Sequence, residues 1–257
     1  GQKDTAEVQL QAMELMGYDA LNLGGPEFNF GKEFLGNTRS HVSFPYIASN
    51  LLYDGSRLPW TREYILKEVG GIKVAILGVL NPEGLAQIPD RERVKGLEAI
   101  PPEAALNRLL PEVRGKADLV ILLSQFDPEK TLALVKAVPG VDVAISSGSD
   151  AFFAPPVEKE TTVLLQTGSQ GKTLGLLKLA FDERGAHRMI ARRYVTLDNS
   201  VPDNGAVARL VEPFKKTEEI KQEQVRKDQA ELLKLSPREF MERYRKEQAE
   251  KGKGEAR

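Results

Sequence analysis

An uninterrupted apolar run in the middle of the chain, residues 119–123, limits the folds that this sequence can adopt. The run is short, rich in branched aliphatic side chains and bounded by the polar residues Asp118 and Ser124, which is typical of a buried strand. A helix signal follows directly, because Asp127 is a good N-cap and Pro128 suits the first helical position. A buried strand followed by a helix predicts an α/β domain.

Strand and helix signals alternate along the first part of the chain, and β-hairpin signals follow. The glycine pair Gly70-Gly71 predicts a hairpin whose second arm is apolar enough to lie inside a sheet. The segments 161–166, 173–182 and 187–196 predict three antiparallel strands, the last two joined by a short turn. This order predicts two packed sheets flanked by helices. The other expected strands are 20–23, 44–50, 118–124 and 141–145, and the expected helices are 4–16 with Asp4 as its N-cap, 102–113 and 127–138.

The character of the sequence changes after Pro202, where charged residues begin to dominate. We therefore expect a domain at residues 1–203 and a charged helical tail at residues 204–257. The tail is interpreted either as a solvated linker helix or as an arm that docks on another domain or subunit. The docking interpretation assigns its apolar contacts to Phe240, Met241 and Tyr244.

Composition excludes several classes of protein. The chain has 257 residues, enough to bury a core, and its lack of cysteine excludes disulfides, iron–sulfur clusters and thiolate zinc sites. A net charge of −1 argues against general nucleic-acid binding. No stretch approaches the roughly 20 apolar residues of a membrane span. The polar start, without an initiator Met or a signal peptide, predicts that a leader was removed or that the chain is a fragment.

A glycine-rich loop, Gly24-Gly25-Pro26-Glu27-Phe28-Asn29-Phe30-Gly31, follows the expected strand at 20–23. A strand that runs into such a turn is where α/β proteins commonly place their chemistry. From residue 12 to residue 31 the sequence resembles the calcineurin-like metallophosphoesterases, in the branch of the 5′-nucleotidases and UDP-sugar hydrolases. Similar stretches at 44–50, 68–74 and 168–175 extend the resemblance from about residue 5 to residue 214. It implies a four-layer αββα sandwich, here with its first strands missing and a C-terminal helical extension.

The resemblance also implies a centre of two divalent metal ions, bound by His, Asp and Asn side chains. The family's metal-binding Asn and catalytic His match Gly25 and Pro26, which offer neither a side-chain ligand nor a proton. Its later His ligands match Gln125, Gly148 and Asp150, and its first ligands would precede this chain. We therefore predict a degenerate site with no two-metal centre, no cofactor and no catalytic residue.

Some oxygen-bearing side chains remain near the former site. Gln125 and Asp150, with Glu27 and Asp127 close in sequence to the same loop ends, leave open a weak magnesium or calcium site. A solvated polar pocket at the strand ends is the favoured interpretation of these residues.

Three other features are not predicted to be sites. His41 and His187 match no ligand of the family and are interpreted as surface residues. The segment 168–173 ends like a phosphate-binding loop but lacks its first glycine, so we expect a tight turn between strands. Ser124 and Ser149 have no histidine at their strand ends that would activate a serine nucleophile.

Three functions stay open from the sequence. The favoured one is a non-catalytic 5′-nucleotidase-like domain that acts as a scaffold or protein-interaction module within a larger protein or assembly. The second is a fragment of a metal-dependent 5′-nucleotidase or sugar-nucleotide phosphohydrolase. The third is a subunit whose incomplete sheet and C-terminal helices engage another domain or chain. No nucleic-acid partner is expected, and the resemblance implies a periplasmic or extracellular location.

Overall fold

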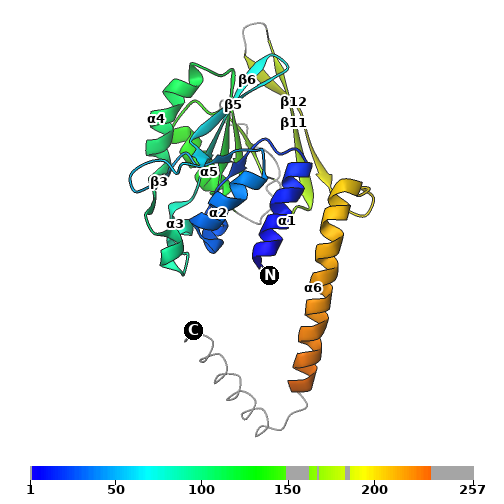
Figure 1. Ribbon diagram of the computed structural model, residues 1–257. Coiled ribbons are helices and arrows are strands. Elements are labelled where there is room, and N and C mark those ends of the chain that lie inside the picture. The colour runs from blue at the N-terminus through cyan, green and yellow to red at the C-terminus, as the bar shows by residue number, and fades with distance from the viewer. Residues whose placement is uncertain (1, 149–161, 167, 183–185, 233–257) are drawn as a thin grey trace. The chain divides into compact units, whose positions relative to one another are not determined.

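A computed structural model describes residues 2–148, 162–166, 168–182 and 186–232 (Figure 1). The chain forms two compact units, residues 1–203 and residues 204–257. The first unit is a mixed α/β structure with several sheets, as the sequence predicts. The second contains the long helix α6 (Gly205–Leu232), which Asn204 caps by accepting hydrogen bonds from the backbone N–H groups of Ala206 and Val207.

A five-stranded sheet in the order β10-β9-β8-β6-β5 is the centre of the first unit. The predicted run forms β8 (Leu119–Ser124), with β6 (Ile72–Val79) and β9 (Val143–Ser146) parallel on its two sides. The edge strand β5 (Tyr64–Val69) is antiparallel to β6. Both glycines of the turn between them have positive φ, 58° and 84°, which confirms the predicted hairpin.

One face of this sheet is covered by helices α4 (Pro102–Arg114) and α5 (Pro128–Ala137) (Figure 1). Asp127 caps α5 by accepting a 2.8 Å hydrogen bond from the backbone N–H of Lys130, and Pro128 occupies the first turn, as predicted. Side chains of both helices and of β6, β8 and β9 form a core from which solvent is excluded. The largest fully buried members of this core are Leu77, Leu106, Leu109, Leu122, Val79 and Val113.

Smaller sheets and short helices form a second core beside the first. Its parallel sheet has the order β1-β2-β4, with β1 at Leu21–Asn22, β2 at Tyr46–Ile47 and β4 at Thr61–Arg62. Strands β3 (Leu51–Tyr53) and β7 (Leu97–Ala99) form an antiparallel pair. The α-helices here are α1 (Gln2–Leu15), α2 (Lys32–Thr38) and α3 (Pro82–Ala86), and the 3₁₀ helices are η1 (Pro26–Phe30), η2 (Arg39–His41) and η3 (Arg91–Val94).

A buried amide joins this second core to the end of β6. The Asn50 side chain donates to the carbonyls of Leu80 and Ile100, each at 3.0 Å, and accepts from the backbone N–H of Leu80 at 2.9 Å. Water would otherwise form hydrogen bonds with the side-chain amide of Asn50. The three bonds inside the protein replace them and so offset the cost of burying this side chain.

The hairpin of β11 (Thr173–Phe181) and β12 (His187–Thr196) lies over the other face of the five-stranded sheet (Figure 1). Its register shifts between Lys178 and Leu179, where Ile190 has no cross-strand partner in the register of the two strands. Among the described residues, these two strands pair only with each other.

Two expectations about the elements are wrong. The strand expected at 161–166 is not antiparallel to its neighbours, because β10 (Val163–Leu165) pairs in parallel with β9. Apolar patterning determines which face of a strand is buried but not which strand becomes its partner. Asp4 is not an N-cap, because α1 already includes Gln2; an acidic residue in the first turn still interacts favourably with the helix dipole.

Two further observations concern the long helices and the tail. Within the part of the chain that the structure describes, no helix combines the length and apolar content needed to cross a membrane. Phe240, Met241 and Tyr244 lie outside the described residues.

Candidate functional site

The carboxyl ends of β6, β8 and β9 meet at one edge of the five-stranded sheet, and the turn before η1 lies beside them. A hydrogen bond joins the two parts: the backbone N–H of Gly25 donates to Oε1 of Gln125 at 3.3 Å. Gly148 follows β9 at the same edge, and its backbone N–H donates to the carbonyl of Phe126 at 3.1 Å. The structure thus brings together Gly25, Pro26, Gln125 and Gly148, whereas Asp150 lies outside the described residues.

This edge is packed so closely that the backbone leaves no room for a side chain at Gly25 or Gly148. A Cβ on Gly25 would lie 2.6 Å from the backbone carbonyl of Gly84 in α3, and real Cβ atoms essentially never come this close. A Cβ on Gly24 would overlap the side-chain amide of Gln125. A Cβ on Gly148 would lie 2.6 Å from the backbone nitrogen of Asp127. The amide of Gln125 therefore fills the space in front of the turn.

Glu27 folds back on the same turn instead of projecting from it. Its Oε2 accepts a 2.8 Å hydrogen bond from the backbone N–H of Gly24. Burial raises the pKa of the Glu27 carboxyl, and hydrogen bonds from the backbone N–H groups of Glu27 and Gly24 offset part of this rise. Pro26, between these residues, is exposed and begins η1.

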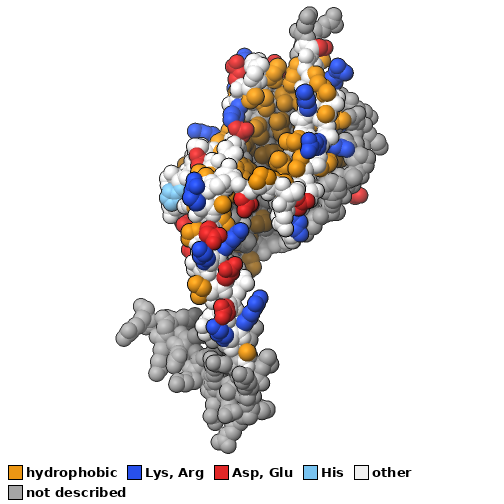
Figure 2. Space-filling view, turned by 90° about the vertical axis from the view of Figure 1, so that its right-hand side faces the viewer, with side chains coloured by type: hydrophobic (Ala, Val, Ile, Leu, Met, Phe, Trp, Pro, Cys, Tyr) orange, Lys and Arg blue, Asp and Glu red, His pale blue; other side chains and the backbone are white. Residues whose placement is uncertain are grey.

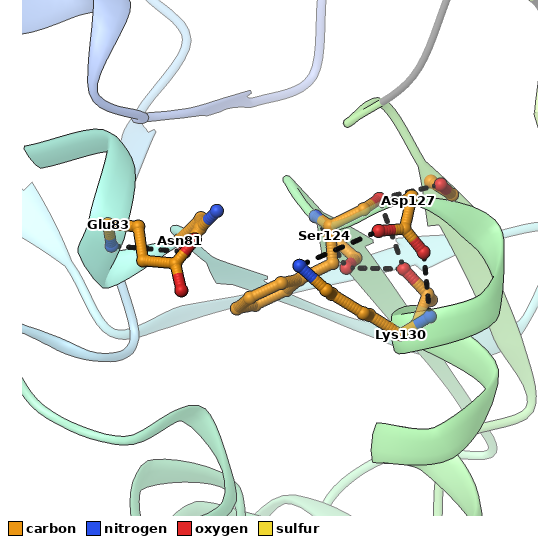
Figure 3. Close-up of polar contacts among 8 residues, drawn as sticks. Asn81, Glu83, Ser124, Asp127 and Lys130 are labelled. Atoms are coloured by element: carbon orange, nitrogen blue, oxygen red, sulfur yellow. Dashed lines mark hydrogen bonds and ion pairs between the residues drawn. The ribbon is translucent and has the colours of Figure 1, made fainter. Parts of the chain in front are cut away.

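Several other polar side chains at this edge cap helices or bond the backbone (Figure 3). Asn81 begins α3 by accepting a 3.0 Å hydrogen bond from the backbone N–H of Glu83, and it lies across from the turn between β8 and α5. On that turn Asp127 caps α5, and the ammonium of Lys130 lies 3.9 Å from its carboxylate. These contacts hold the ends of the elements in place.

Ser124 is not available as a nucleophile. Its side chain is buried, lies 2.8 Å from the hydroxyl of Thr131, and accepts a hydrogen bond from the backbone N–H of Phe126 at 3.3 Å. Both hydroxyls therefore belong to a closed network at the start of α5. Ser149 lies outside the described residues.

The two histidines differ from each other. His41 is exposed, as predicted. The prediction that His187 is a surface residue is wrong: its side chain is 16% exposed, packs against Phe181 and lies with Nε2 3.9 Å from Oδ1 of Asp142. Strand patterning places His187 at the start of β12 but does not show what this strand covers.

Sequence reasoning missed the buried carboxylate that lies beside His187, which belongs to Asp142. The side chain of Asp142 is 6% exposed. Its carboxylate accepts hydrogen bonds from both terminal nitrogens of Arg114, one of them at 2.8 Å, and from the backbone N–H of Val120 at 2.7 Å. An aspartate between the apolar residues Val141 and Val143 is the signal that could have revealed it. Its partners lie on α4, β8 and β12, so the carboxylate joins three elements.

The segment that ends like a phosphate-binding loop is a turn, as predicted. Gly168, Gln170 and Gly171 have positive φ values of 78°, 62° and 63°, and β11 follows at Thr173. Because a strand and not a helix follows, the segment lacks the helix N-terminus that cradles phosphate.

Comparisons with known proteins agree with this architecture. The chain is 32% identical over 124 residues to a 5′-nucleotidase of Vibrio cholerae, covering 46% of this chain and 22% of that relative. It is 25% identical over 257 aligned positions to the trifunctional nucleotide phosphoesterase protein YfkN of Bacillus subtilis, covering 84% of this chain and 17% of that relative. The chain spans about a quarter or less of the length of these curated relatives. No family model matches the chain.

The fold is that of a calcineurin-like phosphoesterase. The crystal structure of the calcineurin-like phosphoesterase YfkN from Bacillus subtilis superposes with a TM-score of 0.66 at 21% identity, over 84% of this chain and 77% of that one. Within this class, the homologues and structural neighbours of the chain are members of the 5′-nucleotidase family, which confirms the resemblance predicted from the sequence.

Proposed function

We propose that the chain is a non-catalytic 5′-nucleotidase-like metallophosphoesterase domain that serves as a scaffold or protein-interaction module within a larger protein or assembly. The observation that carries this proposal is the packing at Gly25. The position that matches the family's metal-binding Asn lies 2.6 Å, measured from an added Cβ, from the backbone of Gly84. A ligand side chain at this position would require α3 to move.

The donor atoms at the former site support the same proposal. Gly25 and Gly148 have no side chain, and Pro26 has no donor or acceptor in its ring. Gln125 already directs its amide oxygen to the backbone N–H of Gly25. A pair of divalent ions needs several carboxylate, imidazole or amide ligands, so these residues do not fit it.

The proposal is tested by assaying the purified chain with manganese, zinc or cobalt against nucleotides and an aryl phosphate. We expect no turnover above background, and metal-dependent turnover would overturn the proposal. A variant with Asp127→Asn and Asp150→Asn, prepared in parallel, is the control. Activity from a contaminating phosphatase would be equal in both preparations, whereas activity of a residual site would fall in the variant.

A fragment of a metal-dependent 5′-nucleotidase or sugar-nucleotide phosphohydrolase is the second candidate. The names of the relatives and the small share of their length that the chain spans favour it. The two candidates differ in what the sequence upstream of Gly1 encodes. An Asp-x-His strand there, together with metal binding by the extended protein in calorimetry, would support the fragment.

A weak magnesium or calcium site at Gln125, Asp127, Asp150 and Glu27 is the form of residual metal binding that remains to be tested. In the described residues, Asp127 caps α5 and Glu27 bonds the Gly24 backbone, so both carboxylates already have partners. Titration of the chain with each ion is expected to give no saturable heat. Saturable binding that Asp127→Asn abolishes would establish such a site.

The partner is proposed to be another protein domain or subunit, reached through the incomplete sheet or the C-terminal helices with Phe240, Met241 and Tyr244. No nucleic-acid partner is proposed, because the net charge is −1. The location is proposed to be periplasmic or extracellular, by resemblance to the family. Light scattering of the isolated chain tests whether it associates through these surfaces. Fractionation of cells that make the full protein tests the proposed location.

A further inference from the structure

The second unit of the chain begins with an Asn-Gly pair, Asn204-Gly205, and this pair occurs nowhere else in the sequence. Both residues are exposed. The backbone nitrogen of the glycine can attack the side-chain carbonyl carbon of the asparagine, because the attack is intramolecular and closes a five-membered ring. A Cβ on Gly205 would meet only the guanidinium of Arg209 within 4 Å, at 3.7 Å, so the space beside the pair is open.

The attacking nitrogen is not engaged, whereas the side chain that it would attack is held. Among the described residues, none accepts a hydrogen bond from the N–H of Gly205, as is usual in the first turn of a helix. Oδ1 of Asn204 accepts hydrogen bonds from the backbone N–H groups of Ala206 at 3.0 Å and Val207 at 3.3 Å. These two bonds fix the side chain at the start of α6, so the ring closes only when the first turn opens.

The first turn of α6 is easily opened. Residues 204–206 are exposed, and Figure 2 shows charged side chains of both signs along α6. The bond from Val207 is longer than an ordinary N–H···O hydrogen bond. Terminal turns with few buried contacts open locally at a free energy far below that of global unfolding. The cap therefore slows the attack on Asn204 without preventing it.

The other asparagines lack this combination of features. Ser200 follows the exposed Asn199, but its N–H donates to Oδ1 of Asp198 at 2.9 Å and is thereby engaged. Pro82 follows Asn81 and has no N–H. The remaining asparagines either donate their amides into the interior or precede bulkier residues within helices, and they are Asn22, Asn50, Asn29, Asn37 and Asn107.

We propose that Asn204 is a site of spontaneous deamidation and that the first turn of α6 sets the rate. The nitrogen of Gly205 forms a bond to Cγ of Asn204, the bond from Cγ to Nδ2 breaks, and ammonia leaves with the proton of the attacking N–H. Water then opens the ring at either of its two carbonyls and leaves aspartate or isoaspartate at this position.

The two products differ in their effect on α6. Aspartate is as good an N-cap as asparagine, and its charge interacts favourably with the helix N-terminus. Isoaspartate carries its Cβ in the main chain, so it no longer presents a side-chain acceptor to Ala206 and Val207. The modification thus divides the protein into molecules with a capped α6 and molecules with an uncapped α6. This inference does not rest on the proposed function.

The test incubates the full chain at mildly alkaline pH and follows each asparagine by peptide mapping and mass spectrometry. Asn204 is expected to convert at least about tenfold faster than Asn199 in the same sample. Gly205→Ala is expected to slow the conversion at least about tenfold, because its methyl group hinders the attack. Fragmentation of the modified peptide by electron transfer distinguishes isoaspartate from aspartate.

A second pair of variants tests the control by α6. Ala206→Gly weakens the first turn and leaves the reacting atoms unchanged, so it is expected to speed the conversion about threefold. Gln222→Gly is the matched control farther along the same helix and is expected to change the rate less than about 1.5-fold. A synthetic peptide with the sequence of residues 199–210, which has no stable helix, is expected to convert faster than the folded chain.

Several results would overturn the inference. One is an intact Asn204 in the folded chain after most of the peptide has converted. Equal conversion of Asn199 and Asn204, or a rate that Gly205→Ala does not alter, would show that the pair is not the reactive site. Equal rates for Ala206→Gly and Gln222→Gly would show that the start of α6 does not control the reaction. Circular dichroism of each variant confirms that it retains its helices.

Discussion

The two faces of the five-stranded sheet carry similarly apolar side chains but are covered to different extents. On one face α4 and α5 bury Leu122, Val120 and their neighbours. On the other face the hairpin β11–β12 leaves Ile121 and Ile145 partly exposed. Because neighbouring residues of one strand supply both faces, the difference lies in the covering elements and not in the sheet. The two faces therefore differ in how much of their apolar surface is removed from water.

The largest predicted effect compares neighbouring residues of β8. Leu122→Ala removes a fully buried side chain from the helix-covered core and is expected to cost about 3 kcal/mol of unfolding free energy. Ile121→Ala, on the partly open face, is expected to cost about 1 kcal/mol because part of its surface already contacts water. Urea unfolding of both variants measures these costs. Equal costs would mean that both faces are equally covered in solution.

The second prediction concerns Asp142, which contacts elements on both sides of the sheet. Asp142→Asn is expected to cost about 2–3 kcal/mol, because it weakens the pairing of a partly buried Arg114 and the hydrogen bond from Val120. Thermal and urea unfolding provide the measurement.

Two further variants show which side of the sheet Asp142 stabilises more. Arg114→Gln, on the helix side, is expected to cost more than His187→Gln, on the hairpin side, because Nε2 of His187 lies 3.9 Å from the carboxylate. Equal costs would show that the hairpin is held as firmly as the helices, which contradicts the comparison of the two faces.

Most of the fold could be predicted because its determinants are local. Gly70-Gly71 specifies the turn between β5 and β6, and Asp127-Pro128 specifies the start of α5. The parallel pairing of β10 with β9 could not be predicted, since it depends on the path of the chain between the two strands. The partly buried state of His187 escaped prediction for the same reason, because Asp142 is distant in sequence.

The candidate site was predicted by position but not by packing. The resemblance pointed to Gly25 and Gln125, and the structure joins them by a hydrogen bond across 100 residues of sequence. The resemblance did not show that Gly24, because it has no side chain, leaves the space that the Gln125 amide fills. Close approach between distant segments follows from the tertiary structure, and no local pattern encodes it.

The third prediction tests how tightly the protein is packed at the edge of the sheet where the carboxyl ends of β6, β8 and β9 meet. Gly25→Ala is expected to cost about 1–2 kcal/mol, because its Cβ would lie 2.6 Å from the backbone of Gly84. Gly84→Ala is the matched control on the other side of the contact: its Cβ would lie 3.8 Å from the Cα of Gly25, which is ordinary contact. The control is expected to change the unfolding free energy by less than about 0.5 kcal/mol. A neutral Gly25→Ala would show that this edge has room for a side chain.

The smallest predicted effect concerns Glu27 at the same edge. Burial raises the pKa of the Glu27 carboxyl in the folded chain above the value of 4.5 for the free side chain. The folded state therefore holds the proton more tightly than the unfolded state, so the contribution of Glu27 to stability is full below pH 4.5 and decreases as the pH rises through the folded pKa. Glu27→Gln removes this loss and keeps an acceptor for the backbone N–H of Gly24.

The difference in unfolding free energy between Glu27→Gln and the parent chain should therefore shift in favour of the variant as the pH rises from 4 to 8. Glu83→Gln is the control for the loss of an acidic side chain, because Glu83 is exposed and belongs to α3 at the same edge. A shift in favour of the parent chain would mean that hydrogen bonds to the ionised carboxylate outweigh its burial. The edge around Gly24 and Gly25 would then be stabilised by a charge, whereas the face of the sheet under the hairpin β11–β12 depends on apolar contact.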